Sequence, residues 1–226
     1  MANKGVRFGS IHSWDTLRLI LMPFAIPPAE PKMTFLDIPA GDGTLDLTEA
    51  LGEVKYKDRE FVMKFTVDPQ SDMTFDEKLT QVSNALNGRA FEIIFDRDSD
   101  WLWEGRCIVN EHAQSKVLQE ITIKAIVKPY KLKREWTECS GTIQENESSC
   151  TVSVENSRKT VVPHMSAGGA SNIHFNFEGK AYEFNNLVTQ IYPEIQLKEG
   201  TNKFTFFRTV GNGKQHFTIL YREGAL

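Results

Sequence analysis

Alternation of apolar and polar residues is the dominant pattern of the chain. Between Arg59 and Val67 it places Phe61, Met63, Phe65 and Val67 on one face, which is typical of a half-buried β-strand. Shorter segments of similar character predict further strands in the first half of the chain: 6–8, 17–21, 33–38, 90–95, 101–109 and 118–127. The first half is therefore expected to be mostly β.

One segment has helical spacing instead. Thr74 and Glu77 form a capping box, and apolar residues follow at Phe75, Leu79, Val82 and Leu86. Asn87-Gly88 supplies a left-handed stop. The spacing predicts one amphipathic helix over 75–86 that packs its apolar stripe on a sheet.

After the charged connection Lys131 to Arg134, the pattern changes to short strands separated by glycine and asparagine, as in a β-sandwich. We therefore predict two domains, 1–132 and 133–226. The first is expected to be a β-sandwich or split barrel carrying the helix, and the second a β-sandwich. Strand candidates in the second half are 152–154, 161–162, 173–177, 182–184, 195–197, 204–206 and 217–220.

The most individual stretch of the chain runs from Phe35 to Gly52. Pro39 is expected to end a strand, and Gly41 and Gly43 to adopt positive φ in a tight turn around Asp42. We expect three leucines to anchor this otherwise irregular segment onto a core: Leu45, Leu47 and Leu51. Upstream, Pro27, Pro28 and Pro31 cannot donate to a ladder, so they predict a hairpin tip or an outward-facing edge.

Composition and charge exclude several classes of protein. With 40% hydrophobic and 25% charged residues, the 226-residue chain is expected to be globular. The formal net charge is -4, and the densest basic region is Lys124 to Arg134. Its spacing is typical of the solvent-exposed face of a strand followed by a linker, so sequence-specific nucleic-acid binding is not expected. The amino terminus has no secretion-signal pattern and no segment is apolar enough to span a membrane, so we expect synthesis in a cytosol without membrane insertion.

Residues with catalytic or metal-binding chemistry are scattered. The five histidines form no HxxxH or HxH pair, no nucleotide-binding glycine loop is present, and Cys107 lies inside a predicted strand. The turn Asp96 to Asp100 lacks the glycine and glutamate of a calcium loop and is expected to be a solvated hairpin tip. Cys139 and Cys150 could pair, but free thiols are favoured. We predict no catalytic residue, no metal and no cofactor.

Taken in order, several motifs resemble the distal tail proteins (Dit) of siphophages. In the first half, the turn His12-Ser13-Trp14-Asp15 and a proline-rich hairpin lead to a glycine turn, in which Ala40 stands where the family often has glycine. In the second half, the turn Leu197 to Asn202 and the end Tyr221 to Leu226 resemble the galectin-like domain of that family. The resemblance spans nearly the whole chain.

The resemblance implies a non-enzymatic virion protein of the phage tail tip, assembled in the host cytoplasm. It implies a homo-hexameric ring, single or stacked in two, that joins the tail tube protein to the tail hub or tail-associated lysin and to receptor-binding proteins. Cyclic assembly uses two different patches of each copy, for which projecting hairpins are suited. The candidate inter-subunit contacts are Pro27, Pro28, Pro31, Gly41, Asp42, Gly43 and Leu47.

Two further hypotheses concern acidic residues that face the lumen of the ring and carbohydrate binding by the second domain. DNA must pass through such a ring without being retained, so we expect acidic side chains toward its lumen; the candidates are Asp37, Asp46, Glu49 and Glu53. The alternative function is a carbohydrate-binding module contacting cell-wall glycans, because His174-Phe175-Asn176 matches the start of a galectin sugar strand. No arginine follows closely, however, and the last tryptophan, Trp136, precedes the strands of this domain, which disfavours a galactoside site.

Overall fold

The computed structural model describes residues 5–50, 52–114, 119–168, 173–184, 189–208 and 213–226, with only the backbone at 111–114. Within these residues the chain is mostly β with one α-helix, as predicted. It divides into two compact units, one formed by residues 1–131 with Leu226 and the other by residues 132–225. Each unit has its own apolar core.

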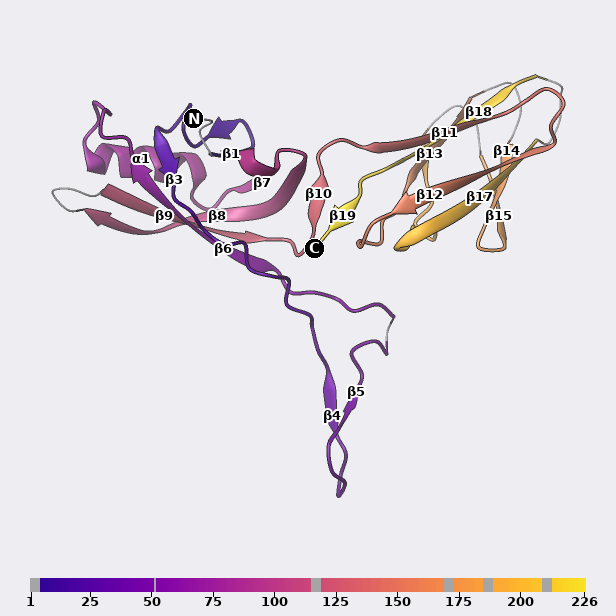
Figure 1. Ribbon diagram of the computed structural model, residues 1–226, viewed down its shortest axis with the longest axis horizontal. Helices are drawn as coiled ribbons and strands as arrows, with labels where there is room; N and C mark the ends of the chain where they lie inside the picture. The colour runs from indigo at the N-terminus through magenta and orange to yellow at the C-terminus, as the bar shows by residue number, and fades with distance from the viewer. Residues whose placement is uncertain (1–4, 51, 115–118, 169–172, 185–188, 209–212) are drawn as a thin grey trace. The chain divides into compact units, whose positions relative to one another are not determined.

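The first unit is built on a curled antiparallel sheet (Figure 1). Its strands follow the order β2-β1-β7-β8-β9-β6-β3. Their bounds are β1 Val6–Phe8, β2 Ile11–His12, β3 Leu19–Leu21, β6 Arg59–Val67, β7 Ala90–Phe95, β8 Trp101–Gln114 and β9 Gln119–Val127. The alternation predicted for β6 is confirmed, since Phe61, Met63, Phe65 and Val67 are all buried.

The helix α1 (Phe75–Leu86) covers one face of this sheet. The predicted capping box is present: the Thr74 hydroxyl accepts from the Glu77 N–H at 3.4 Å, and the Glu77 carboxylate accepts from the Thr74 N–H at 2.9 Å. Phe75, Val82 and Leu86 are buried against the sheet, and Gly88 adopts the expected left-handed conformation with φ 73°. The helix therefore closes the core of the first unit.

Removing the cap should weaken the first unit. Thr74→Ala deletes the side-chain acceptor and leaves one N–H of the first turn without its partner, which costs about 1 kcal/mol. Urea unfolding followed by circular dichroism measures this loss. Thr74→Ser, which keeps the hydroxyl, is the matched control and should unfold like the wild type.

The second unit is a β-sandwich of two four-stranded antiparallel sheets, ordered β11-β18-β13-β16 and β12-β17-β14-β15. The strands of the first sheet are β11 Thr137–Ile143, β13 His164–Gly168, β16 Gln190–Ile191 and β18 Gln215–Tyr221. Those of the second are β12 Ser149–Asn156, β14 Ile173–Phe177, β15 Lys180–Glu183 and β17 Gly200–Arg208. Both sheets contribute side chains to one core, in which the rings of Phe206 and Phe217 stack with centroids 3.7 Å apart.

Some strand predictions in this half differ from the structure. Residues 161–162 and 195–197 form no strand; they meet only in an isolated bridge between Val161 and Leu197. Conversely, the strands β11 and β13 were not predicted, because their polar and small residues carry little alternation. Two short strands, β10 (Lys131–Lys133) and β19 (Gly224–Ala225), also pair with each other.

A partly buried ion pair joins the two ends of the second unit. The Glu223 carboxylate accepts from the Lys133 ammonium at 2.9 Å and from the Thr137 hydroxyl at 2.6 Å. Burial by itself would raise the pKa of Glu223, but these hydrogen bonds and the nearby Lys133 charge outweigh it, so the pKa lies below the usual 4.5. A lowered carboxyl pKa stabilises the fold above that pH, and the contribution is lost as the pH falls through the folded-state value.

Glu223→Gln should therefore lower the free energy of unfolding of the second unit by about 1–2 kcal/mol at pH 7, because a charge-assisted hydrogen bond becomes a neutral one. The difference from the wild type should shrink as the pH falls below 4.5 and through the lower folded-state pKa of Glu223, because the native carboxylate then takes up a proton. Chemical unfolding at pH 7 and at pH 3.5 tests this. A difference that does not depend on pH would contradict it.

Candidate inter-subunit surface

Between β3 and β6 the chain leaves the sheet as a two-stranded ribbon, which we call the arm (residues 27–58). Its base is laddered: the Lys32 N–H donates to the Lys55 carbonyl at 2.7 Å, and the Lys57 N–H donates to the Glu30 carbonyl at 2.9 Å. Its far part is the hairpin of β4 (Phe35–Asp37) and β5 (Thr44–Asp46) (Figure 1). The proline-rich segment and the glycine turn thus belong to one element.

None of the residues that the structure describes between Ile20 and Asp58 is buried. The arm carries five large apolar side chains that are roughly half exposed: Met33, Phe35, Leu36, Ile38 and Leu45. The prediction that leucines anchor this segment on a core is wrong for Leu45, which is 52% exposed, and for Leu47, which is half-buried and lies outside both cores. Leu51 falls outside the described residues. An arm with this much exposed apolar surface is typical of a protein-protein contact.

The register of the hairpin sorts its side chains onto two faces. Phe35 lies opposite Asp46, Leu36 opposite Leu45, and Asp37 opposite Thr44. Because successive residues of a strand point to opposite faces, Leu36 and Leu45 share one face. Phe35 lies on the other face with two carboxylates, Asp37 and Asp46. The hairpin is therefore apolar on one side and mixed aromatic and acidic on the other.

The turn at the tip of the arm differs in detail from the prediction. Positive φ occurs at Gly43 (81°), as expected, but at Ala40 (58°) rather than at Gly41. Gly41 closes the turn instead by donating its N–H to the Ile38 carbonyl at 3.1 Å. Alanine has a Cβ that disfavours the left-handed region, so glycine would fit position 40 with less strain.

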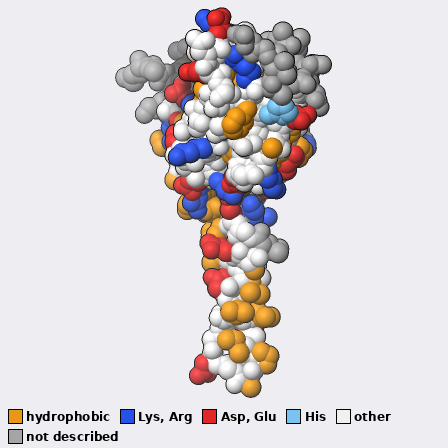
Figure 2. All heavy atoms as spheres, turned by 90° about the vertical axis from the view of Figure 1, so that its right-hand side faces the viewer, with side chains coloured by type: hydrophobic (Ala, Val, Ile, Leu, Met, Phe, Trp, Pro, Cys, Tyr) orange, Lys and Arg blue, Asp and Glu red, His pale blue; other side chains and the backbone are white. Residues whose placement is uncertain are grey.

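The distal arm is acidic. Between Met33 and Val54 the sequence has five carboxylates and no lysine or arginine, and Figure 2 shows the narrow part of the molecule with hydrophobic and acidic side chains on its surface. Hydrogen bonds from the Thr48 hydroxyl and N–H lower the pKa of Asp46, so it stays ionised. The four acidic residues expected at a lumen all belong to the arm, and all four are exposed: Asp37, Asp46, Glu49 and Glu53.

Six of the seven predicted contact residues divide between the two ends of the arm, and Leu47 lies between these ends, directly after β5. Pro27, Pro28 and Pro31 lie at the base, where the Arg59 guanidinium donates to the Pro27 carbonyl at 3.3 Å. Arg59 is itself buried over the Trp103 ring at 4.8 Å, and burial lowers its pKa. Gly41, Asp42 and Gly43 lie at the tip. The structure therefore places these residues on one ribbon without bringing them into a single cluster.

Beside the arm base is a hollow that the sequence did not reveal. It has a volume of about 170 Å³ and is lined by Gly5, Leu21, Met22, Pro23, Phe24, Phe95 and Arg97. Most of these side chains are apolar, and the Arg97 guanidinium lies over the rings of Phe24 and Phe95 at 5.1 and 5.5 Å. We call this site the hollow. It offers an apolar space with a cation beside it.

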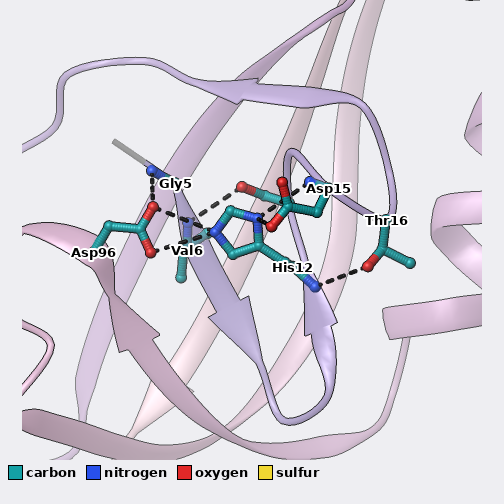
Figure 3. A network of polar contacts seen from close by, with 7 residues as sticks. Gly5, Val6, His12, Asp15, Thr16 and Asp96 are labelled. Carbon is teal, nitrogen blue, oxygen red and sulfur yellow. Dashed lines mark hydrogen bonds and ion pairs between the residues drawn. The ribbon is translucent and has the colours of Figure 1, made fainter. Parts of the chain in front are cut away.

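A partly buried polar network around His12 holds one wall of the hollow in place (Figure 3). The His12 ring lies between two carboxylates, with Nδ1 3.0 Å from Asp15 and Nε2 3.3 Å from Asp96. Asp96 also accepts from the Gly5 N–H at 2.6 Å. The prediction that residues 96–100 form a solvated hairpin tip is confirmed, since they connect the paired strands β7 and β8 and four of the five are exposed. Within this tip Asp96–Asp98 is a 3-10 helix (η1), and the contacts of Asp96 with Gly5 and His12 position Arg97.

The described residues contain no cluster of three or more histidine, cysteine or acidic side chains that could hold a metal ion. Cys107, Cys139 and Cys150 are free thiols, and burial raises the pKa of Cys107 to about 12, which makes it a poor nucleophile. Among the same residues, no helix is long and apolar enough to cross a membrane.

The lysines of the basic region are each paired with a carboxylate: Lys124 with Glu60, Lys128 with Glu104, Lys131 with Asp98 and Lys133 with Glu223.

The galectin-like strand of the second unit has its predicted packing. Phe175 and Phe177 are buried in the core, and His174 lies 3.4 Å from Glu183. Trp136, just before β11, belongs to this unit and is 45% exposed. The Arg222 guanidinium lies 5.4 Å from the Trp136 ring centre, and the His164 ring lies 4.9 Å away.

Comparison with known proteins gave a match in structure alone. No protein-family model and no curated protein sequence matches the chain. Among solved structures it is similar to the Dit protein of SPP1 (gp 19.1), described as a paradigm of the hub adsorption apparatus in phages that infect Gram-positive bacteria. The TM-score is 0.66 with 12% sequence identity, over 98% of this chain and 99% of that one. The chain therefore has the fold of a Dit protein along nearly its whole length.

Proposed function

We propose that this chain is a structural, non-enzymatic protein of a phage tail tip, a Dit subunit that assembles into a hexameric ring. In this role it connects the tail tube protein to the tail hub and to the receptor-binding proteins. The observation that carries the proposal is the shared fold, since one two-domain arrangement extends over 98% of this chain and 99% of a hub adsorption protein. Fold alone does not fix function, so the arm supplies the second argument.

The arm supports assembly because its exposed apolar residues do not pack into the core of their own chain. A strand pair without a buried face is marginal in water and is stabilised by packing on another surface. A projecting ribbon that meets a different patch on the next copy makes a heterologous contact, which closes into a ring when the rotation allows it. We propose that the base prolines, the Gly41 to Gly43 turn and Leu47 take part in that contact.

The acidic arm also fits the passage of DNA. We propose that some of the arm carboxylates face the bore, where they repel phosphates and keep the duplex moving. Because the arm has no lysine or arginine between Met33 and Val54, it offers no cation there to hold the nucleic acid. A bore lined mainly by lysine and arginine in the assembled ring would contradict this.

Light scattering on the purified protein tests the ring. We expect a mass of about 154 kDa, six times the 25.7 kDa of one chain, or twice that value for two stacked rings. A stable monomer at high concentration would reject self-assembly in solution. Adding purified tail tube or hub protein and finding no ring would then reject the function itself.

A second candidate function is glycan binding by the second unit. It is favoured by Trp136, whose half-exposed ring lies beside Arg222, because an aromatic ring and a bidentate donor are components of sugar sites. Binding on a glycan array that is lost in Trp136→Ala would support this function. An array without any bound glycan would reject it.

A further inference from the structure

We propose that Phe35 of one copy inserts into the hollow of the next copy, with Asp37 and Asp46 placed beside Arg97. The inference rests on the proposed ring and names the two surfaces that meet in it. It follows from the size of the hollow, from the side chains on one face of the arm and from the charges at both places.

The hollow has room for one aromatic ring. An apolar protein cavity of about 150 Å³ stays dry and binds benzene, and the hollow has about 170 Å³. Its lining residues Leu21, Met22, Pro23 and Phe24 come from the chain that leads into the arm, and Phe95 closes the other side. The residues that contribute most of the binding free energy of a protein interface insert into apolar pockets of this kind.

The arm offers one suitable ring. Phe35 is 52% exposed, whereas the other aromatic residue of the arm, Tyr56, is half-buried and packs edge-on against Tyr130 with centroids 5.8 Å apart. A phenylalanine has few rotamers to lose on insertion, so it gains most of the free energy of its burial. Phe35 therefore matches the hollow in both size and chemistry.

Charge selects the face of the arm that docks. Phe35 lies directly opposite Asp46 and two residues before Asp37 on the same strand, so both carboxylates flank its ring. At the hollow, the flanking group is the exposed Arg97 guanidinium. The other face, with Leu36 and Leu45, brings no carboxylate from the paired strands. Opposite charges at the rim of an apolar contact fix its register and suppress wrong partners.

This docking divides the acidic residues of the arm by role. Of the four residues predicted to face the bore, Asp37 and Asp46 lie at the junction between copies, which leaves Glu49 and Glu53 for the bore. Because the arm and the hollow are different patches of the same chain, each copy donates one and accepts one. The contact is therefore head-to-tail and suits a closed ring.

Photo-crosslinking identifies the site directly. Benzoylphenylalanine in place of Phe35, in an oligomer mixed from isotopically labelled and unlabelled chains, should cross-link between copies to peptides containing residues 21–24 or 95–97. The same group in place of Leu36, which is similarly exposed on the opposite face, should not reach these peptides. Cross-links within one chain, or between copies to other peptides, would overturn the inference.

Mixing two variants tests the head-to-tail logic. Phe35→Ser removes the inserted ring and Arg97→Glu turns the rim acidic, so each variant alone should associate at least tenfold more weakly than the wild type. A 1:1 mixture retains one intact arm and one intact hollow, and should form only dimers of about 51 kDa, twice the mass of one chain. Variants that still form the wild-type oligomer would overturn the inference while leaving the ring intact. A wild-type monomer would instead reject the proposed ring.

Discussion

Replacing residues 34–47 by the two-residue turn Asn-Gly should give a monomer that is as stable as the full chain. The deletion removes β4, β5 and the glycine turn, and none of their described residues is buried. Met33 and Thr48 then flank a type I′ turn, which suits the twist of the remaining ladder. The thermal midpoint should stay within about 2 °C of that of the dissociated wild type, because no core contact is lost.

Light scattering and differential scanning calorimetry on the same samples check both halves of this prediction. Met73→Ala is the matched control, since Met73 is an exposed apolar residue outside the arm and its loss should leave assembly unchanged. An arm-deleted protein that still assembles would show that the contact lies elsewhere. One that unfolds would show that the arm stabilises its own chain.

Phe217→Ala should destabilise the second unit and spare the first. Phe217 is 1% exposed, and its ring stacks on the ring of Phe206. The ring also occupies the space beside Gly141, where an added Cβ would lie only 2.3 Å from the Phe217 Cζ atom. Truncating a buried phenylalanine costs about 3–5 kcal/mol. In a unit of this size the loss lowers the midpoint by about 15 °C or more.

Because the two units have separate cores, the first should keep its own transition. Calorimetry should therefore show one transition shifted down and one unchanged. Ile191→Ala, at an exposed position of the same unit, is the control and should shift neither. A single transition that moves as a whole would mean that the units unfold together.

The elements that follow from local patterns were predictable. The capping box at Thr74 and Glu77 set the start of α1, and alternation located β6 and β14, both residue for residue. In these segments the periodicity, the caps and the burial all agree, which is the condition under which sequence specifies structure.

The arm shows where such reasoning fails. The leucines at positions 45 and 47 were expected on a core, because an alternating apolar pattern reports that a face is covered without saying which chain covers it. In the structure Leu45 is exposed and belongs to neither core, so the pattern is not explained by packing within the chain. The difference between core and interface is one of location and not of residue type.

The hollow and its polar network were hidden for another reason. Their parts are distant in the sequence: His12 and Asp96 are 84 residues apart, and Leu21 to Phe24 meet Phe95 and Arg97 only through the pairing of the sheet. No local pattern marks such a meeting. Ala40 is a similar case, since an alanine gives no sign that its backbone adopts positive φ.

We propose that copies of this chain assemble around a common axis. Electron microscopy of the assembled oligomer, at a resolution that shows strands, is the decisive test. We expect six copies around an open bore, with the arm of each copy reaching its neighbour. A particle without a bore, or a two-fold dimer joined arm to arm, would contradict it.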